Sequence, residues 1–577
     1  MNTQIKSSTS ILLLSFVVLG IYYPALFAPL NSIDDPVMYN YLLNTDSFTL
    51  QNIFAPGGSN YYRPILIMSY MMDKYVWGLE ESFMHLENIV FHLLNTLLVF
   101  AVARKAALLQ GILSGILPLI AALFFAIHPL NTEVVAWISG RTDLLAGFFL
   151  FLTVWLLLRK STNNALTLLA ALCMLLGCLA KETAIFFLPA TIILPFFIPN
   201  SESNGASLRV TFLKNLPHLL LFSIAGAAYF AFRTAAFTRG DVGVSQVFSH
   251  VGGEKSGGLL LTLRLVFKAA GFYLKKLFIP FPLNFGITHV SDLYIPVGIL
   301  LFVLVIWLLT RRTLAAFFFV CAAVVGSSAL MVPLLNQTWT PLAERYMYIP
   351  SAFFIMGLTF AICRWEKRIR YQPIITGLLT LIAGIAIYGT ASRTILWQDN
   401  LAFYQDTLRK SPDFVPAKNE LANALYAEGK IEQANAIITS MPLPEDLLNR
   451  QYGLSSKASV LLNNGDFAGA RALMNQALAN PGKHEVEILN KLLLIDRLQL
   501  MAKKATIKEL YPGSVKNLTR LIELTGNPFY SYRLGIVHMQ MGERRKALTV
   551  FDTVVRTAAP AAYYRKPAEK LAKELAK

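Results

Sequence analysis

The sequence is poor in charge for its length. Only 15% of its residues are Asp, Glu, Lys or Arg, whereas 55% are hydrophobic. A soluble domain carries about 25% charged residues, so a wholly soluble chain is excluded. The shortage is uneven, because residues 1–392 contain 16 acidic and 25 basic side chains while the shorter stretch 393–577 contains 18 and 26. The composition therefore predicts a membrane part followed by a soluble part.

Cysteine is also scarce, and the four residues all fall in apolar segments. This pattern excludes a disulfide framework and contains no metal-binding spacing. No glycine-rich loop follows a strand, so a nucleotide-cradling motif is missing as well. No basic stripe marks a soluble face, which argues against nucleic acid as a partner. We assign the formal net charge of +17 mainly to membrane topology and lipid contact. The cysteines are Cys173, Cys178, Cys321 and Cys363.

Long apolar runs are abundant. A membrane span needs about 20 such residues. The first run, Ser10–Leu30, lacks the small-residue cleavage site of a signal peptide, and we expect it to be retained as a span. Eleven spans are expected, at about 9–28, 86–103, 112–127, 134–158, 163–180, 183–199, 211–232, 294–310, 314–334, 348–363 and 373–392.

Basic residues in short loops predict the orientation, because they mark the cytoplasmic side. With eleven alternating spans, the N-terminus is cytoplasmic and everything after Thr394 lies on the opposite, outer side. Residues 259–282 are apolar but carry basic residues at helical spacing. We expect an amphipathic helix on the outer membrane surface there, with a re-entrant hairpin as the alternative. The cytoplasmic basic residues are Lys6, Arg104, Lys105, Arg159, Lys160, Arg209, Arg311, Arg312 and those of 364–370.

A repeated pattern occurs in the last third of the chain. Three segments have a glycine followed five positions later by an alanine, after an apolar helical stretch. The spacing of the first two is close to the 34-residue tetratricopeptide period. Residues 482–527 are expected to hold a degenerate repeat. Such arrays offer a concave surface to peptides or partner proteins, the alternative being a spacer without a ligand. The pairs are Gly429 and Ala434, Gly465 and Ala470, and Gly542 and Ala547.

Two adjacent carboxylates, Asp34 and Asp35, follow the first expected span on the outer side. One of them can act as a general base on an acceptor hydroxyl, while the other steers the acceptor or holds a cation. The same Asp-Asp-Pro sequence also suits the cap of a loop helix. The sequence leaves both interpretations open.

Further polar residues lie at the outer ends of the spans. Glu133, Arg141 and Asp143 enter an apolar run, where an unpaired charge is heavily penalised, so we expect ion pairs among them or with Arg63. His85 and His92 share one face of an expected helix with Asn88, and they either bind a metal or pack against polar neighbours.

Two cations at the outer interface, Lys181 and Arg345, favour an anionic lipid phosphate, although snorkelling alone explains each. Together with the acidic pair they indicate an outward-facing cavity for transfer from a lipid-phosphate donor. In such a cavity a cation stabilises the released phosphate and a carboxylate deprotonates the acceptor.

Taken in order, these motifs resemble those of the transmembrane and tetratricopeptide-repeat O-mannosyltransferases, and more broadly the GT-C superfamily of glycosyltransferases. The resemblance covers nearly the whole chain. Its motifs are Asp34-Asp35, Tyr62-Arg63-Pro64, His85-x-x-Asn88-x-x-x-His92, His128-Pro129 with Glu133, Gly140-Arg141-x-Asp143, Lys181-Glu182, Glu344-Arg345-Tyr346-x-Tyr348-x-Pro350, and Arg393 with Trp397-x-Asp399.

The resemblance implies an all-α protein, with a polytopic membrane helix bundle of GT-C type followed by a soluble tetratricopeptide solenoid. We expect a catalytic membrane domain over 1–392, a linker helix over 393–415 and the repeat domain over 416–577. The family implies a polyprenyl-phosphate-linked sugar as donor and a protein hydroxyl as acceptor, recruited through the repeats. Its relatives differ in their need for a metal, so a divalent metal stays open.

By the same resemblance, Asp34 and Asp35 are the catalytic pair, with Asp34 as the base, and Arg345, Lys181 and Arg63 bind the donor phosphate. The short loops are typical of a bacterial protein, which predicts the inner membrane and a periplasmic outer side. The alternatives are transfer to a lipid or glycan, a lipid-glycan transporter, and a non-catalytic membrane scaffold. Supporting polar residues are His85, His92, His128, Glu133, Arg141, Asp143, Glu182, Glu344 and Tyr346.

Overall fold

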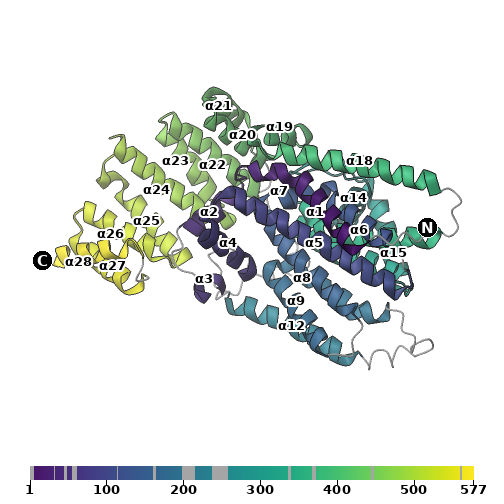
Figure 1. Cartoon of the computed structure of the whole chain (residues 1–577). Helices are drawn as coiled ribbons and strands as arrows, with labels where there is room; N and C mark the ends of the chain where they lie inside the picture. The colour runs from purple at the N-terminus through teal and green to yellow at the C-terminus, as the bar shows by residue number, and fades with distance from the viewer. Residues whose placement is uncertain are drawn as a thin grey trace. The chain divides into compact units, whose positions relative to one another are not determined.

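The computed structural model contains two compact helical units, Met1–Asp413 and Phe414–Lys577 (Figure 1). No strand occurs in the described ranges, where Ile287 and Leu342 form an isolated bridge. The predicted all-α fold class is confirmed. The domain limits expected at 392 and 415 stay a prediction. The structure describes residues 6–31, 33–43, 49–54, 62–112, 115–159, 164–197, 215–236, 258–335, 340–366, 372–443, 447–558 and 562–576.

The first unit is built mainly from long apolar helices connected by short 3₁₀ turns. Figure 1 shows α1 and α6 beside the long helix α5, in agreement with their contacts. Its α-helices are α1 Ser7–Tyr22, α2 Asp35–Leu43, α3 Leu50–Phe54, α4 Pro64–Trp77, α5 Glu81–Leu109, α6 Ile116–Ala126, α7 Thr132–Ala136, α8 Arg141–Leu157, α9 Asn164–Ala180, α10 Leu188–Ile193, α12 Leu216–Ala236, α14 Gly258–Phe278, α15 Tyr294–Leu309, α16 Leu314–Leu335, α17 Tyr348–Glu366, α18 Gln372–Leu396 and α19 Asn400–Lys410. Its 3₁₀ helices are η1 Tyr23–Phe27, η2 Pro129–Asn131, η3 Ile138–Gly140, η4 Glu182–Phe187, η5 Leu194–Phe196 and η7 Glu344–Met347.

The membrane-crossing potential of these helices agrees with the expected spans. Within the described residues, seven helices are long and apolar enough to cross a membrane. An eighth candidate is the pair Ile116–Ala126 and Pro129–Ala136, which is bent by 48°, and three further apolar helices are shorter. Each of the eleven expected spans overlaps one of these segments, and the chain is a multi-pass membrane protein. The basic residues Lys160, Arg209 and 367–370, used above for orientation, lie outside the described residues.

The basic segment expected over 259–282 forms one uninterrupted helix, α14, rather than a hairpin. It packs closely against α15, because glycines stand where the two helices cross. A Cβ atom added to Gly271 would overlap the carbonyl of Tyr294, and one added to Gly298 would overlap the carbonyl of Phe267. This close approach fixes α14 beside the helices that carry the polar residues described below.

The second unit consists of antiparallel helix pairs, as the repeat pattern predicts. Gly429, Gly465 and Gly542 occupy the turns within three pairs, each with φ between 75° and 83°, a conformation that glycine adopts without strain. The alanines five residues later are fully buried against the partner helices. The helices are α20 Val415–Ala427, α21 Ile431–Ser440, α22 Leu447–Asn463, α23 Phe467–Leu478, α24 Glu485–Met501, α25 Ile507–Thr525, α26 Pro528–Gln540, α27 Arg544–Thr557 and α28 Arg565–Ala576.

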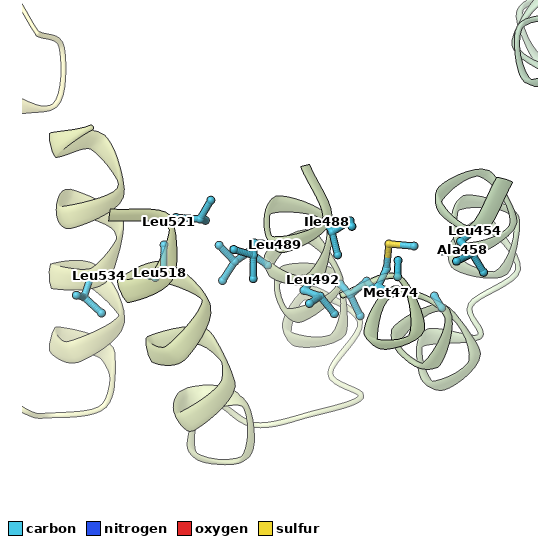
Figure 2. Close-up of a cluster of buried hydrophobic side chains, with 13 residues drawn as sticks. Leu454, Ala458, Met474, Ile488, Leu489, Leu492, Leu518, Leu521 and Leu534 are labelled. Carbon is cyan, nitrogen blue, oxygen red and sulfur yellow. The ribbon is translucent and has the colours of Figure 1, made fainter. Parts of the chain in front are cut away.

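A continuous apolar core connects the repeats across the expected degenerate stretch. Figure 2 shows Leu489 and Leu492 of α24 lying between Met474 of α23 and Leu518 of α25. Residues 482–527 thus contribute a helix pair, α24 and α25, without the Gly–Ala signature. The turn after α24 has Lys503 at a φ of 53°, where the other pairs place glycine.

Candidate functional site

The two carboxylates of the acidic pair have different surroundings. Asp35 heads α2 and is fully buried. Its carboxylate accepts hydrogen bonds from the backbone N–H of Asn31 at 2.9 Å, from the backbone N–H of Ser139 at 3.2 Å and from the Ser139 hydroxyl. Asp34, one residue earlier, is only partly buried. Asp35 therefore anchors the loop, and Asp34 is the carboxylate with access to solvent.

Burial affects the protonation of the anchoring carboxylate. Loss of solvent raises the pKa of Asp35 to about 7, and the Ser139 hydrogen bonds oppose this effect. The negative charge of Asp34 also raises the pKa of Asp35. Asp35 therefore keeps its proton to a higher pH than an ordinary aspartate does.

The acidic loop is also tied to the helix that follows the last span. The Tyr404 hydroxyl donates to the side-chain oxygen of Asn31 at 3.2 Å, and the Asn400 amide donates to the carbonyl of Leu30 at 3.2 Å. The Gln398 amide reaches the carbonyl of Pro24 at 2.8 Å. Segments at the two ends of the first unit thus hold the loop in place.

Arg345, the predicted phosphate ligand, belongs to η7 and is buried. Its Nη1 lies 2.7 Å from Oε1 of Glu133, and its guanidinium stands 5.3 Å from the Trp137 ring and 5.0 Å from the Tyr346 ring. Trp137 belongs to the same turn as Ser139, the residue that anchors Asp35, so the acidic loop and Arg345 approach this turn from two sides. The structure therefore brings the more exposed carboxylate and the predicted phosphate ligand into one region.

Lys181 lies in the same region. Its Nζ is 2.6 Å from both carboxylate oxygens of Asp143 and 5.6 Å from the centroid of the Tyr346 ring. Tyr346 therefore has Lys181 and Arg345 near its ring. Aromatic faces attract cations, so this ring helps to hold two positive charges near each other.

The third predicted cation, Arg63, makes a two-point contact with Glu182. The distances are 2.8 Å from Nε and 2.6 Å from Nη2 to the two carboxylate oxygens. Both side chains keep partial solvent exposure, and the charge of Arg63 acts on the neighbouring Lys181. All three predicted cations thus occupy a connected charged region of the first unit.

The expected ion pairs among Glu133, Arg141, Asp143 and Arg63 are wrong. Each of these four residues pairs with a residue outside the set. Arg141 binds Asp73 of α4 at 2.5 Å and Glu87 of α5 at 3.1 Å. The physical reason is that Arg141 begins α8 and points toward α4 and α5.

The two remaining acids pair with cations from turns that are distant in the sequence, Glu133 with Arg345 and Asp143 with Lys181.

Arg141 is the most deeply enclosed of these charges, with no exposed side-chain surface. Its remaining N–H groups donate to the Asn88 side-chain oxygen at 3.0 Å and to the Met84 carbonyl at 2.8 Å. The ring of Tyr70 lies 4.9 Å from the guanidinium. These contacts from every guanidinium nitrogen indicate a structural role for Arg141.

Glu344 is held by a cation that the sequence interpretation did not connect with it. Lys276 of α14 lies 2.5 Å from Oε1 of Glu344, and the backbone N–H of Asn284 donates to the same oxygen at 2.9 Å. Lys276 belongs to the basic segment 259–282, for which the sequence predicts a helix on the membrane surface. Lys276 follows Phe272 by four residues, so the two side chains share one face of the helix. Because Phe272 is a core residue, this spacing indicates that Lys276 faces inward.

The histidines serve as packing groups in this structure. His92 lies 2.9 Å from the Tyr348 hydroxyl and 3.2 Å from the Ala126 carbonyl through its two ring nitrogens. His128 accepts from the Leu130 backbone N–H at 3.3 Å, and His85 is buried on α5. Within the described part of the chain, no three His, Cys, Asp or Glu residues are grouped so as to hold a metal.

Comparison with known sequences finds relatives named protein O-mannosyl-transferases. No protein-family model matches it. It is 24% identical over 444 residues to the human protein O-mannosyl-transferase TMTC1, an alignment covering 65% of this chain and 47% of the relative. It is 30% identical over 162 residues to mouse TMTC1, covering 25% and 17%. The Caenorhabditis elegans protein O-mannosyl-transferase F38B6.6 is 23% identical over 67% of this chain and 54% of its own length.

These relatives confirm the resemblance to the transmembrane and tetratricopeptide-repeat O-mannosyltransferases. The chain spans about half the length, or less, of the curated relatives that it matches. Among solved structures, the apo form of the Archaeoglobus fulgidus oligosaccharyltransferase is similar at 14% identity with a TM-score of 0.37, over 71% of this chain and 60% of that one.

Proposed function

We propose that the chain is a GT-C type glycosyltransferase that moves a sugar from a polyprenyl phosphate to a Ser or Thr hydroxyl of a protein. The transfer takes place on the periplasmic side of the inner membrane. The observation that carries the proposal is geometric. The partly exposed Asp34 precedes Asp35, whose carboxylate binds Ser139. The ring of nearby Trp137 lies 5.3 Å from the Arg345 guanidinium. A base and a phosphate ligand are the two groups that this reaction needs.

In the proposed reaction, the acceptor oxygen attacks the anomeric carbon of the sugar. Asp34 accepts the hydroxyl proton as the new carbon–oxygen bond forms. The bond from the anomeric carbon to the phosphate oxygen breaks, its electron pair leaves with the polyprenyl phosphate, and the configuration inverts. Arg345 donates hydrogen bonds to the phosphate and stabilises the charge of the leaving group.

The other two cations complete the phosphate site in this proposal. Lys181 lies beside the same Tyr346 ring as Arg345, and Arg63 acts electrostatically on Lys181. Each cation already has a carboxylate partner, which limits the cost of burying it. Glu133 and Asp143 thus position Arg345 and Lys181 for the donor.

An apolar cavity next to these cations supports a lipid-linked donor. It measures about 1530 Å³ and is lined by α14, α15 and α16, together with parts of η4 and α17. Met347 lines it and belongs to the same 3₁₀ helix as Arg345. An isoprenoid chain is wholly apolar and gains free energy wherever it leaves water for such a lining. A phosphate attached to that chain would then lie near Arg345.

The repeat unit and the relatives support a protein acceptor. Arrays of paired helices offer an extended surface for peptides or partner proteins. The similar proteins are named protein O-mannosyl-transferases. We therefore place acceptor recruitment on the second unit and the transfer chemistry on the first.

The proposal is tested with purified protein in nanodiscs, offered a polyprenyl-phosphate sugar and a Ser/Thr-containing peptide. Mass spectrometry should detect the glycosylated peptide, and Asp34→Asn should abolish it without changing thermal stability. Normal turnover by the Asp34→Asn variant would show that the base is assigned wrongly. If glycolipids of a deletion strain change while its proteins do not, the acceptor is a lipid or glycan. If no acceptor is modified under any condition, the scaffold or transporter alternative replaces transfer.

A further inference from the structure

Arg533 on α26 is a partly buried cation that lacks a partner. Within the described part of the chain, its guanidinium makes no ion pair and no hydrogen bond, and burial lowers its pKa. Buried charges are costly unless they are paired, and Arg141 and Arg471 obey that rule. Arg533 thus retains hydrogen-bonding capacity for a group from outside the chain.

A second arginine adds to the positive charge at this place. Arg497 on α24 is exposed and makes no ion pair with any described residue. A 3.0 Å hydrogen bond from the Asn490 amide to the Tyr530 hydroxyl joins α24 to α26, and each arginine follows this bond on its own helix. The carboxylate in this region, Asp496, is already occupied. It lies 2.6 Å from Arg471 and accepts a hydrogen bond from the Ser514 hydroxyl at 2.6 Å. Asp496 is thus one carboxylate among three arginines, and the local charge is positive.

Aromatic rings border the two arginines. Tyr563 is 74% exposed and lies near α26, where Arg533 follows Phe529 by four residues on the same helix face. The ring of Phe529 lies 6.0 Å from that of Tyr563 and 5.5 Å from that of Tyr564. Tyr530 is fixed by a 3.0 Å hydrogen bond from the Asn490 amide. Rigid aromatic side chains beside unpaired arginines are the residue types that dominate protein-binding surfaces.

We propose that Arg497, Arg533 and Tyr563 form a docking surface for an acidic segment of a partner protein. The arginines bind carboxylates of the segment, and the Tyr563 ring packs on its backbone. The charge of the unit favours this partner, because residues 414–577 contain 23 Lys and Arg against 15 Asp and Glu, a formal net charge of +8. The docking surface does not depend on the glycosyl transfer proposed above.

The test uses the full chain in nanodiscs of zwitterionic lipid, so that anionic lipid does not compete. Fluorescence anisotropy follows a labelled oligoglutamate peptide, with an oligoglutamine peptide of equal length as the neutral probe. We expect oligoglutamate to bind and oligoglutamine not to bind. Arg533→Gln and Arg497→Gln should each weaken binding about tenfold, as expected for losing one charge-assisted hydrogen bond. Arg533→Lys should weaken it less than Arg533→Gln.

The matched control removes equal charge from α27 through Arg545→Gln combined with Arg556→Gln, both exposed positions. Binding should persist in this control. Equal weakening in the control and in the Arg497→Gln Arg533→Gln double variant would mean that only the net charge attracts the peptide, and the docking surface would be rejected. Equal binding of oligoglutamine would reject it too. Thermal unfolding of each variant verifies that the second unit remains folded.

Discussion

Asp35 and Ser139 lie 104 positions apart in the sequence, yet the Asp35 carboxylate accepts from both the backbone N–H and the hydroxyl of Ser139. The contact attaches the loop before α2 to the 3₁₀ turn before α8. Asp34 directly precedes Asp35, so the position of Asp34 depends on the hydrogen bonds between Asp35 and Ser139.

Ser139→Ala should therefore destabilise the acidic loop while leaving every charged group in place. The variant loses one donor to a buried carboxylate, and we expect a loss of about 1–3 kcal/mol in the free energy of unfolding. Transfer should fall as well, with a smaller loss than in Asp34→Asn. Thermal unfolding in detergent and the peptide glycosylation assay measure the two effects. Unchanged stability would argue that the Asp35 anchor is unimportant.

The pH dependence of stability should carry a contribution from Asp35. Burial raises its pKa from 3.8 to about 7, so between these pH values the native state holds a proton that the unfolded chain has released. The free energy of unfolding should therefore fall as the pH rises from about 4 to about 7, and should not change further above that. Thermal unfolding across this range should show a shallower slope for Asp35→Asn. An identical slope would contradict the prediction.

Arg345→Ala should reduce transfer by about 100-fold to 1000-fold, because a charged donor to the leaving group is lost. Arg345→Lys should recover only part of the rate, since an ammonium cannot make the two-point contact of a guanidinium. Glu133→Gln serves as the comparison. It keeps Arg345 and an acceptor oxygen beside it, and removes only the negative charge of the partner at 2.7 Å. If Arg345→Ala kept full activity, the phosphate would have to bind elsewhere.

Arg141 should matter for folding rather than for transfer. Arg141→Leu leaves Asp73 and Glu87 near each other without their cation, and breaking such a buried pair costs about 3–5 kcal/mol. The Arg141→Leu Asp73→Leu double variant should be more stable than the single one. Yield of monodisperse protein and thermal unfolding provide the measurement. A stable single variant with lost transfer would instead place Arg141 in the reaction.

Replacing a glycine by alanine where α14 and α15 cross should destabilise the protein. Gly271→Ala would overlap the Tyr294 carbonyl, and such overpacking costs about 1–3 kcal/mol. Gly384→Ala on α18 is the matched control, since no atom lies within 4 Å of its added Cβ. Thermal unfolding should show a decrease for the first variant and none for the second. Equal behaviour of the two variants would mean that the helices separate without cost.

Much of the architecture could be predicted because it depends on local composition. The eleven apolar runs and the Gly–Ala spacing reflect hydrophobic length and turn geometry, which are properties of short windows. The pair formed by α24 and α25 was recognisable only from its position, because Lys503 takes the left-handed conformation where the other turns have glycine.

The charged region was predicted in its members but not in its pairing. Arg345 and Glu133 are 212 positions apart, and Arg63 and Glu182 are 119 apart. Ion pairing over such separations depends on which helices pack together, and a short stretch of sequence does not reveal this. Lys276 was assigned to a surface helix for the same reason. The difference between Asp34 and Asp35 also needed the structure, because it follows from the burial of Asp35 against Ser139.

The carboxylate partners of the cations have a consequence for turnover. A phosphate that arrives at Arg345 must share the guanidinium with Glu133 or displace it, and the same holds at Lys181 with Asp143. In the proposed reaction, these acids then compete with the released polyprenyl phosphate for the cations. This competition would weaken binding of the polyprenyl phosphate product, so that it can dissociate and a new donor can bind.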